Sequence, residues 1–405
     1  MTTMTAGGHV LESVPGGVCV TPGVTASGVA AGLKPSGRRD LALVAAPEVV
    51  AAAAVQTTNQ VKAHPVVVTA RHIGDGRARA VLLNAGSANV CTGPDGLALA
   101  ERSAVLVGEA LGCAASDVLL CSTGVIGQPI PADGFLAGIP AAAAALSRAG
   151  GAAAAEAILT TDTTAKEFAV RATDDAGGSC VVGGMAKGSG MIDPALATML
   201  CVITTDAAIA GPALQATLHD VVARTFGRIS VDGCMSTNDA VLLLATGGAE
   251  RAPSAAAFTA ALTQVCGRLA ESIVRDGEGA EKLVRIQVTG ARTEDDAVGI
   301  GRAIASSNLV KTALAGGDPN WGRVLAAMGA SPVRFHPERV AVAFGEVTVC
   351  RLGVAAGFDR DQAAMQLKDR DVVITVDLGA GPAQASFLTC DLTHGYITIN
   401  ADYTT

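Results

Sequence analysis

Residues 187–200, KGSGMIDPALATML, hold the side chains in this sequence that most clearly could do chemistry. The glycines allow a close backbone approach, and Pro194 stiffens the chain. Ala197 puts little bulk on the carbonyl that the hydroxyl of Thr198 would attack. These features are compatible with self-cleavage between Ala197 and Thr198. A glycine loop that leads into a strand has the same composition, so this pattern alone leaves both interpretations open.

The usual partners of a hydroxyl nucleophile are missing from the sequence. None of the six histidines lies in a recognisable triad or metal motif, and there is no G-x-S-x-G elbow or Walker loop. An N-terminal threonine can instead use its own α-amine as the base. Such an amine titrates at about 7.7 to 8.0, so it is substantially neutral at physiological pH. A cut before Thr198 would create this amine.

Several other segments occur in a characteristic order along the chain. They are 57–65 (TTNQVKAHP), 84–89 (NAGSAN) with 91–93 (CTG), 121–127 (CSTGVIG), 160–163 (TTDT), 232–239 (DGCMSTND), 276–280 (DGEGA) and 318–323 (DPNWGR). Together with residues 187–200, these segments resemble the bifunctional ornithine acetyltransferase/N-acetylglutamate synthase family over essentially the whole chain.

The resemblance implies cleavage between Ala197 and Thr198, which gives an α chain of residues 1–197 and a β chain of residues 198–405. Thr198 would be the nucleophile. It would accept the acetyl group of N2-acetylornithine, release ornithine and pass the acetyl group to glutamate by a ping-pong mechanism in cyclic arginine biosynthesis. The resemblance leaves open acetyl-CoA as a second acetyl donor, and it implies an α2β2 heterotetramer that requires no metal or organic cofactor.

The same resemblance assigns oxyanion stabilisation to the Thr123 hydroxyl and the Gly124 backbone, although these residues also suit a turn after a strand over 118–121. Thr160 is an alternative to Thr161 as a substrate contact, because adjacent threonines leave the register ambiguous. A lysine for a carboxylate and a glutamate for an ammonium group are chemically sensible partners. The implied substrate contacts are Thr161, Lys187, Thr198, Glu278, Asn400 and Thr405.

Composition limits the other classes of function. The 405-residue chain is 50% hydrophobic, has a net charge of −8 and contains no long run of like charges, so nucleic acid is not an expected partner. Its apolar stretches are interrupted well short of the roughly 18 to 20 residues that span a bilayer. No cationic start precedes an apolar core at the N-terminus. The ten cysteines are dispersed and form no CxxC pair. We expect a cytoplasmic protein.

Short apolar runs bounded by turn formers predict strands, and alanine-rich amphipathic windows predict helices. Their alternation predicts an α/β protein, whose length favours two domains. The resemblance implies a self-processing N-terminal-nucleophile-like α-β-β-α sandwich with a smaller C-terminal α/β domain. The predicted strands are 16–20, 41–44, 66–68, 80–84, 118–121, 181–186, 199–205, 284–289 and 372–376, and the predicted helices are 98–111, 213–225 and 309–315.

Two other classes of function compete with acetyl transfer. Self-processing aminopeptidases are similar in fold and nucleophile but hand the acyl group to water, and fold alone does not separate the two. The charged residues Lys187 and Glu278 favour two amino-acid substrates and therefore transfer. A metabolite-binding protein without enzymatic activity would leave Thr198 as an ordinary strand residue in an uncut chain.

Overall fold

The computed structural model describes residues 3–6, 8–193 and 199–402. Its larger lobe is built on a ten-stranded sheet with the order β1-β2-β7-β8-β9-β11-β4-β5-β6, in which β3 also pairs with β4. The strands are β1 (Thr3–Ala6), β2 (His9–Val14), β3 (Thr25–Val29), β4 (Leu41–Gln56), β5 (Arg77–Ser87), β6 (Val118–Val125), β7 (Lys166–Asp174), β8 (Ser179–Lys187), β9 (Leu200–Thr205) and β11 (Ala240–Ala245).

The long strand β4 folds this sheet into two layers. Its first part pairs with β3 and β5, a register shift follows between Ala45 and Val50, and its second part pairs with β11. Side chains from β5 and β6 therefore meet side chains from β8, β9 and β11 in one buried cluster between the layers. Leu83 and Leu242 belong to this cluster, and burial of each such side chain stabilises the fold by about 1.5–3 kcal/mol.

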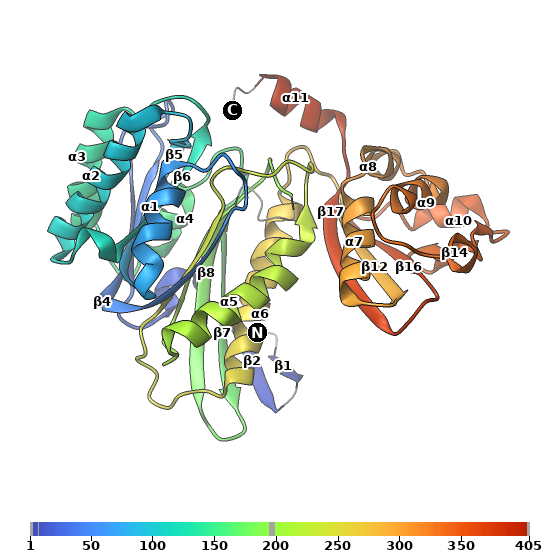
Figure 1. The fold of residues 1–405 in the computed structure, drawn as a ribbon, viewed down its shortest axis with the longest axis horizontal. Helices are drawn as coiled ribbons and strands as arrows, with labels where there is room; N and C mark the ends of the chain where they lie inside the picture. Colours follow the sequence, from blue (N-terminus) through green and yellow to red (C-terminus); the bar gives the residue numbers. More distant parts are fainter. Residues whose placement is uncertain (1–2, 7, 194–198, 403–405) are drawn as a thin grey trace.

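Helices cover both outer faces of the folded sheet. Helices α1 (His64–His72), α2 (Gly93–Leu111) and α3 (Ala132–Ala144) cover the β4–β6 layer. Helices α5 (Gly211–Arg224) and α6 (Ala255–Arg275) cover the β7–β11 layer, and α4 (Gly151–Ala157) packs at the edge of the cluster between the layers. This arrangement is the predicted α-β-β-α sandwich (Figure 1).

The smaller lobe contains the second sheet, with the order β10-β17-β12-β16-β13-β14-β15. Its strands are β10 (Ile229–Ser230), β12 (Leu283–Ala291), β13 (Ala341–Phe344), β14 (Val347–Arg351), β15 (Val354–Ala355), β16 (Asp371–Asp377) and β17 (Ala383–Cys390). Its helices are α7 (Glu294–Ala305), α8 (Asn308–Ala315), α9 (Trp321–Gly329), α10 (Arg360–Met365) and α11 (His394–Asp402). Figure 1 shows α11 reaching back from this lobe toward the larger one.

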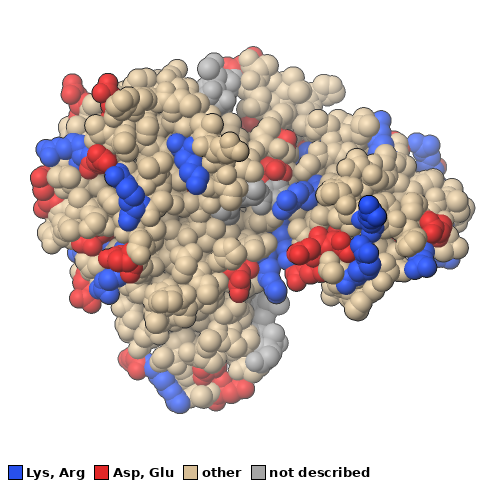
Figure 2. Space-filling model, in the orientation of Figure 1, with Lys and Arg blue, Asp and Glu red and all other residues tan. Residues whose placement is uncertain are grey.

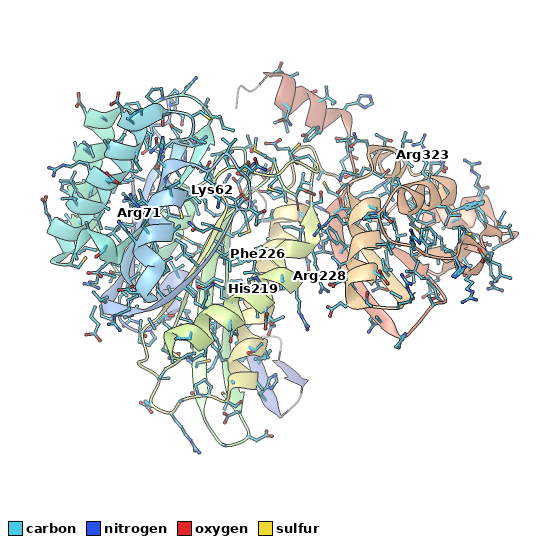
Figure 3. All side chains as sticks on the ribbon, viewed as in Figure 1. Lys62, Arg71, His219, Phe226, Arg228 and Arg323 are labelled. Atoms are coloured by element: carbon cyan, nitrogen blue, oxygen red, sulfur yellow. The ribbon has the colours of Figure 1, made fainter. Side chains whose placement is uncertain are left out.

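The junction between the lobes carries ion pairs. Arg228 of the larger lobe donates to Glu294 of α7 at 2.5 Å, and Arg275 at the end of α6 pairs with Asp371 at 2.6 Å. Arg228 lies at this junction in Figure 3. On the face shown in Figure 2, acidic and basic side chains are interspersed over both lobes. Within the part of the chain that the structure describes, no helix is both long and apolar enough to cross a membrane.

Two of the predicted strands are wrong. Residues 66–68 lie in helix α1, where Pro65 occupies the first turn, a position that does not need its missing N–H. A run of three valines is too short to reveal its period. Residues 18–20 of the predicted strand 16–20 form a 3₁₀ turn instead, preceded by Gly16 with a φ of 114°. The other predicted strands and helices all fall on observed elements of the same type, although the predicted strand 41–44 is only the first part of β4 (Leu41–Gln56).

The predicted cleavage site does not coincide with the division into lobes. It falls between β8 and β9, which pair antiparallel in the larger sheet, whereas the division follows α6. The predicted α and β chains would therefore share one sheet and one core.

Candidate active site

A cavity of about 180 Å³ gathers most of the predicted site residues where β6 and β8 end. Of the predicted residues, Thr123, Gly124, Thr161, Lys187, Glu278 and Asn400 line it, and so does Thr160. Ala197, Thr198 and Thr405 lie outside the described residues. The remaining lining residues are Ala88, Ile126, Gly190, Met191, Asp232, Cys234, Ser236, Thr237, Asn238 and Tyr396. Two strand ends and several separate segments of the chain therefore converge on one site.

Thr123 and Gly124 belong to strand β6, which continues to Val125, so the predicted alternative of a turn is wrong. Gly124 has a φ of 126°, and a Cβ at this position would overlap the backbone of Gly86 on β5. Only glycine allows the two strand ends to approach so closely. The side-chain amide of Asn238 donates to the carbonyl of Ser122 at 2.8 Å and fixes this edge of the cavity.

Lys187, the last residue of β8, brings a buried ammonium group to the cavity. Only 2% of the residue is exposed. Its Nζ donates to Thr160 Oγ1 at 2.7 Å and to Thr123 Oγ1 at 3.3 Å, and it lies 3.6 Å from Asp162 Oδ2. Lys187 thus connects the predicted oxyanion threonine to the 160–163 segment.

A network of buried charges lies behind Lys187. Lys166 Nζ donates to Asp162 Oδ1 at 2.8 Å and to Asp276 Oδ2 at 2.6 Å, and the backbone N–H of Gly188 donates to Asp162 Oδ1 at 2.6 Å. Burial alone would raise the pKa of the Asp162 carboxyl, but the ammonium groups of Lys187 and Lys166 and the Gly188 N–H outweigh it and hold this pKa well below its usual range. Asp162 is therefore a permanent anion at physiological pH.

Residues 187–190 (KGSG) position Glu278. Ser189 Oγ donates to the carbonyl of Asp276 at 2.6 Å, and the backbone N–H of Glu278 donates to the carbonyl of Ser189 at 2.9 Å. A Cβ on Gly190 would overlap the Glu278 carboxylate, so this carboxylate packs directly on the glycine backbone. Asn400 Nδ2 on α11 then donates to Glu278 Oε2 at 2.8 Å. The predicted approach of the C-terminal segment to the site holds for Asn400.

Two aspartates of the 232–239 segment hold the chain on either side of residues 194–198. Asp232 accepts hydrogen bonds from the backbone N–H groups of Met191 at 2.6 Å and Ile192 at 3.0 Å. Met191 has a φ of 58°, a strained value for a non-glycine residue. Asp239 Oδ1 accepts from the backbone N–H of Met199 at 3.1 Å. Both ends of the predicted cleavage segment are therefore anchored by carboxylates.

Asp239 is unusual because one of its oxygens is unpaired. The residue is 1% exposed, and Oδ2 has no hydrogen-bond partner among the described residues. Burial raises the pKa of this carboxyl well above its ordinary value, and the Met199 N–H, the Ser236 side chain and the ammonium of Lys187 only partly oppose that effect. Such a group costs stability, so its hydrogen bond to Met199, the residue that follows Thr198, is notable.

Sequence reasoning missed several residues of the site. Asp162, Asp232 and Asp239 lie inside motifs that the sequence singled out, but nothing in the sequence distinguishes them from turn acids. Tyr396 lines the cavity from α11 without any sequence signal. Burial, followed by the nearby Asp232, raises the pKa of its phenol, so the hydroxyl stays neutral.

The donor set of the site suits acyl transfer. A strand-end hydroxyl and glycine sit beside a buried ammonium group, and a carboxylate–amide pair lies on another wall of the same cavity. Among the described residues, no three His, Cys, Asp or Glu side chains gather as metal ligands would. Sandwich and cavity together define an enzyme of the acyltransferase class.

Comparisons with known proteins give the family. The model of the ArgJ family matches residues 25–405. The chain is 47% identical over 396 residues to the arginine biosynthesis bifunctional protein ArgJ of Mycobacterium tuberculosis (strain ATCC 25618 / H37Rv), covering 96% of both chains. It is 48% identical over 403 residues to the protein of the same name from Symbiobacterium thermophilum, covering 98% of this chain and 100% of the relative. The chain belongs to the ArgJ family and acts in acetyl transfer in arginine biosynthesis.

Solved structures are also similar to parts of the chain. A crystal structure of arginine biosynthesis bifunctional protein argJ from Bacillus halodurans is 40% identical, covers 49% of this chain and 97% of its own, and has a TM-score of 0.48. An ornithine acetyltransferase from Mycobacterium tuberculosis complexed with ornithine is 41% identical, covers 47% of this chain and 100% of its own, and has a TM-score of 0.42.

Proposed function

We propose that the enzyme transfers the acetyl group of N2-acetyl-L-ornithine to L-glutamate through an acetyl ester on Thr198. The observation that carries this proposal is a single cavity that joins Thr123 and Gly124 to Lys187 and to the Glu278–Asn400 pair, next to the strand that follows Thr198. Substrate contacts are proposed for Thr161 or Thr160, Lys187, Thr198, Glu278, Asn400 and Thr405.

In the first half-reaction, the hydroxyl oxygen of Thr198 adds to the acetyl carbonyl and its proton passes to the α-amine of the same residue. The amide C–N bond then breaks, and the departing nitrogen takes that proton, so that ornithine leaves and Thr198 holds the acetyl group as an ester. In the second half-reaction, the neutral α-amine of glutamate adds to the ester carbonyl. Its proton returns through the Thr198 amine to the threonine oxygen as N-acetylglutamate leaves.

The negative charge of each tetrahedral intermediate needs donors. Thr123 and the Gly124 backbone are the proposed oxyanion donors, and one such donor contributes about 10²- to 10³-fold to kcat in other acyl-transfer enzymes. Glu278 offers a carboxylate for the free ammonium group of N2-acetylornithine, and Asn400 holds this carboxylate in place. Electrostatic positioning is therefore the main proposed source of catalysis.

The proposed cleavage and the proposed nucleophile are tested together. Mass spectrometry of the mature protein is expected to give two fragments, with a new N-terminus at Thr198. Thr198→Ala is expected to remain uncut and inactive, whereas Thr198→Ser should retain part of both activities because it keeps a hydroxyl. An intact wild-type chain of 40.2 kDa after full maturation would remove the α-amine and with it the mechanism.

An assay separates transfer from hydrolysis. Ornithine release from N2-acetylornithine is measured with and without glutamate, and release is expected to depend on glutamate. Equal rates under both conditions would favour a self-processing amidohydrolase. Formation of N-acetylglutamate and free CoA from acetyl-CoA and glutamate tests the second proposed donor, and light scattering of the mature enzyme tests the proposed α2β2 assembly.

A further inference from the structure

We propose that Lys187 acts mainly as a positioning residue for the oxyanion donor: it turns the hydroxyl proton of Thr123 toward the reacting carbonyl. This inference rests on the proposed function, because it takes Thr123 as an oxyanion donor. It differs from the expectation that Lys187 binds a substrate carboxylate.

The direction of the hydrogen bonds carries the argument. An ammonium group can only donate, so the oxygens of Thr123 and Thr160 must both accept from Lys187. Thr123 therefore keeps its own O–H proton for another acceptor. Among the described residues, no hydrogen bond from the Thr123 hydroxyl to an acceptor is found, while the residue lines the cavity. The proton is thus available to a substrate carbonyl that becomes an oxyanion.

The protons of Lys187 are already directed toward the protein. Two of them are used by the threonine hydroxyls, and the ammonium also forms an ion pair with the carboxylate of Asp162 at 3.6 Å. A substrate carboxylate bound here would share this ammonium with Asp162, which carries the same charge. Lys187 is buried and its ammonium has only three N–H donors. Orienting Thr123 is the role that leaves its present hydrogen bonds in place.

The charge network keeps the ammonium in this place. Asp162 is itself held by Lys166 and by the backbone N–H of Gly188, the residue after Lys187. Lys166 in turn bonds Asp276, which precedes the Glu278 segment. Lys187 therefore cannot move without disturbing paired buried charges, and donors fixed in advance are those that stabilise a developing oxyanion without reorganisation. A positive charge 3.3 Å from the Thr123 oxygen also makes its hydroxyl a stronger donor.

A donor that lacks only the carboxylate separates the two roles. N-acetylputrescine is N2-acetylornithine without its carboxylate, and p-nitrophenyl acetate lacks both charged groups. Acetylation rates of wild type, Lys187→Met and Lys187→Gln are measured with all three donors, per mole of cleaved chain counted by intact mass. The amide of Lys187→Gln keeps one hydrogen-bond donor for Thr123. If Lys187→Met matures poorly, Lys187→Gln still tests the proposal. Lys368→Met, an exposed charge loss in the smaller lobe, is the control.

We expect Lys187→Met to slow acetylation by about 10²-fold with all three donors, the loss typical of one oxyanion donor. Lys187→Gln should lose less, and Lys368→Met should match wild type. In a Thr123→Val background, Lys187→Met should add little, because both changes remove the same interaction. A loss confined to N2-acetylornithine, or losses that multiply in the double variant, would overturn the proposal. Persistent acetylation of Thr198→Ala would instead overturn the proposed function and leave these ratios unaffected.

Discussion

The amide nitrogen of Asn400 donates to the carboxylate of Glu278 at 2.8 Å, although the two residues stand 122 positions apart in the chain. The Glu278 backbone N–H donates to the Ser189 carbonyl, and its carboxylate packs on Gly190. Asn400 lies on α11, the last helix of the smaller lobe. This hydrogen bond attaches α11 to the segment that connects α6 to the smaller lobe, so the smaller lobe completes the substrate site that the larger lobe begins.

Asn400→Ala should raise KM for N2-acetylornithine several-fold and leave the melting temperature nearly unchanged. The expected cause is a less well positioned Glu278 carboxylate, and a several-fold rise in KM corresponds to about 1 kcal/mol. Steady-state kinetics measure the effect, and Thr398→Ala, an exposed residue on the same helix, serves as the control. A bulky C-terminal tag should also raise KM. Wild-type KM values for both the Asn400 variant and the tagged enzyme would argue against substrate contact by this segment.

Gly190→Ala should impair substrate binding because its Cβ would occupy the space of the Glu278 carboxylate. We expect KM to rise by about tenfold or more, on the basis of about 1–3 kcal/mol for a forced rearrangement. Gly329→Ala is the matched substitution, since a Cβ there meets no atom within 4 Å. Similar KM values for both variants would show that the close approach of Gly190 and Glu278 has no role in binding.

Asp162→Asn should destabilise the protein at neutral pH, and the difference from wild type should shrink in acid. The pKa of Asp162 is lowered in the folded state, so its stabilising contribution is present above the unfolded pKa of about 3.9 and is lost as pH falls through the folded pKa. Breaking a buried pair costs about 3–5 kcal/mol. Urea unfolding at pH 7 and pH 3 measures this cost.

Asp371→Asn provides the comparison for the Asp162 prediction, because its pair with Arg275 is largely exposed. It should change the free energy of unfolding by no more than about 1 kcal/mol at either pH. A pH-independent loss in Asp162→Asn would contradict the assignment of Asp162 as the anion that neutralises both lysines.

Asp239→Asn should not lower the melting temperature, and it should slow self-cleavage. The amide oxygen can still accept from Met199, while the buried carboxyl oxygen without a partner, which costs about 1–3 kcal/mol, is removed. Time courses of fragment formation measure the cleavage. Asp391→Asn is the matched control for Asp239→Asn. One Asp391 oxygen accepts from two backbone N–H groups, and the other has no hydrogen-bond partner among the described residues. An Asp239 variant that unfolds more easily but cleaves at the wild-type rate would exclude a role for this carboxylate in processing.

The sequence allowed the α/β class to be predicted because strands buried on both faces form continuous apolar runs with recognisable ends, whereas the α-β-β-α sandwich was implied by the resemblance. Residues 199–205 and 181–186 are examples. The strand predicted at the valines 66–68 is wrong because three residues carry no period, and the neighbouring Pro65 lies in the first turn of a helix. The single ten-stranded sheet was not predicted, because the passage of β4 between layers depends on pairing with distant strands.

The candidate site was predictable as a set of residues through the resemblance and not through local physics. The contacts that give these residues their roles join Lys187 to Thr123 and Asn400 to Glu278, and neither contact follows from spacing along the chain. Asp162 has the composition of an ordinary turn residue. Its depressed pKa arises only when Lys166, Lys187 and the Gly188 N–H surround it.

The acetyl-enzyme itself is the most direct test. The mature protein is incubated with N2-acetylornithine in the absence of glutamate, and both fragments are weighed by mass spectrometry. We expect the fragment that begins at Thr198 to gain the mass of one acetyl group, located on Thr198 by peptide sequencing, and to lose it when glutamate is added. An unmodified fragment under conditions that release ornithine, or an acetyl group on another residue, would contradict the account.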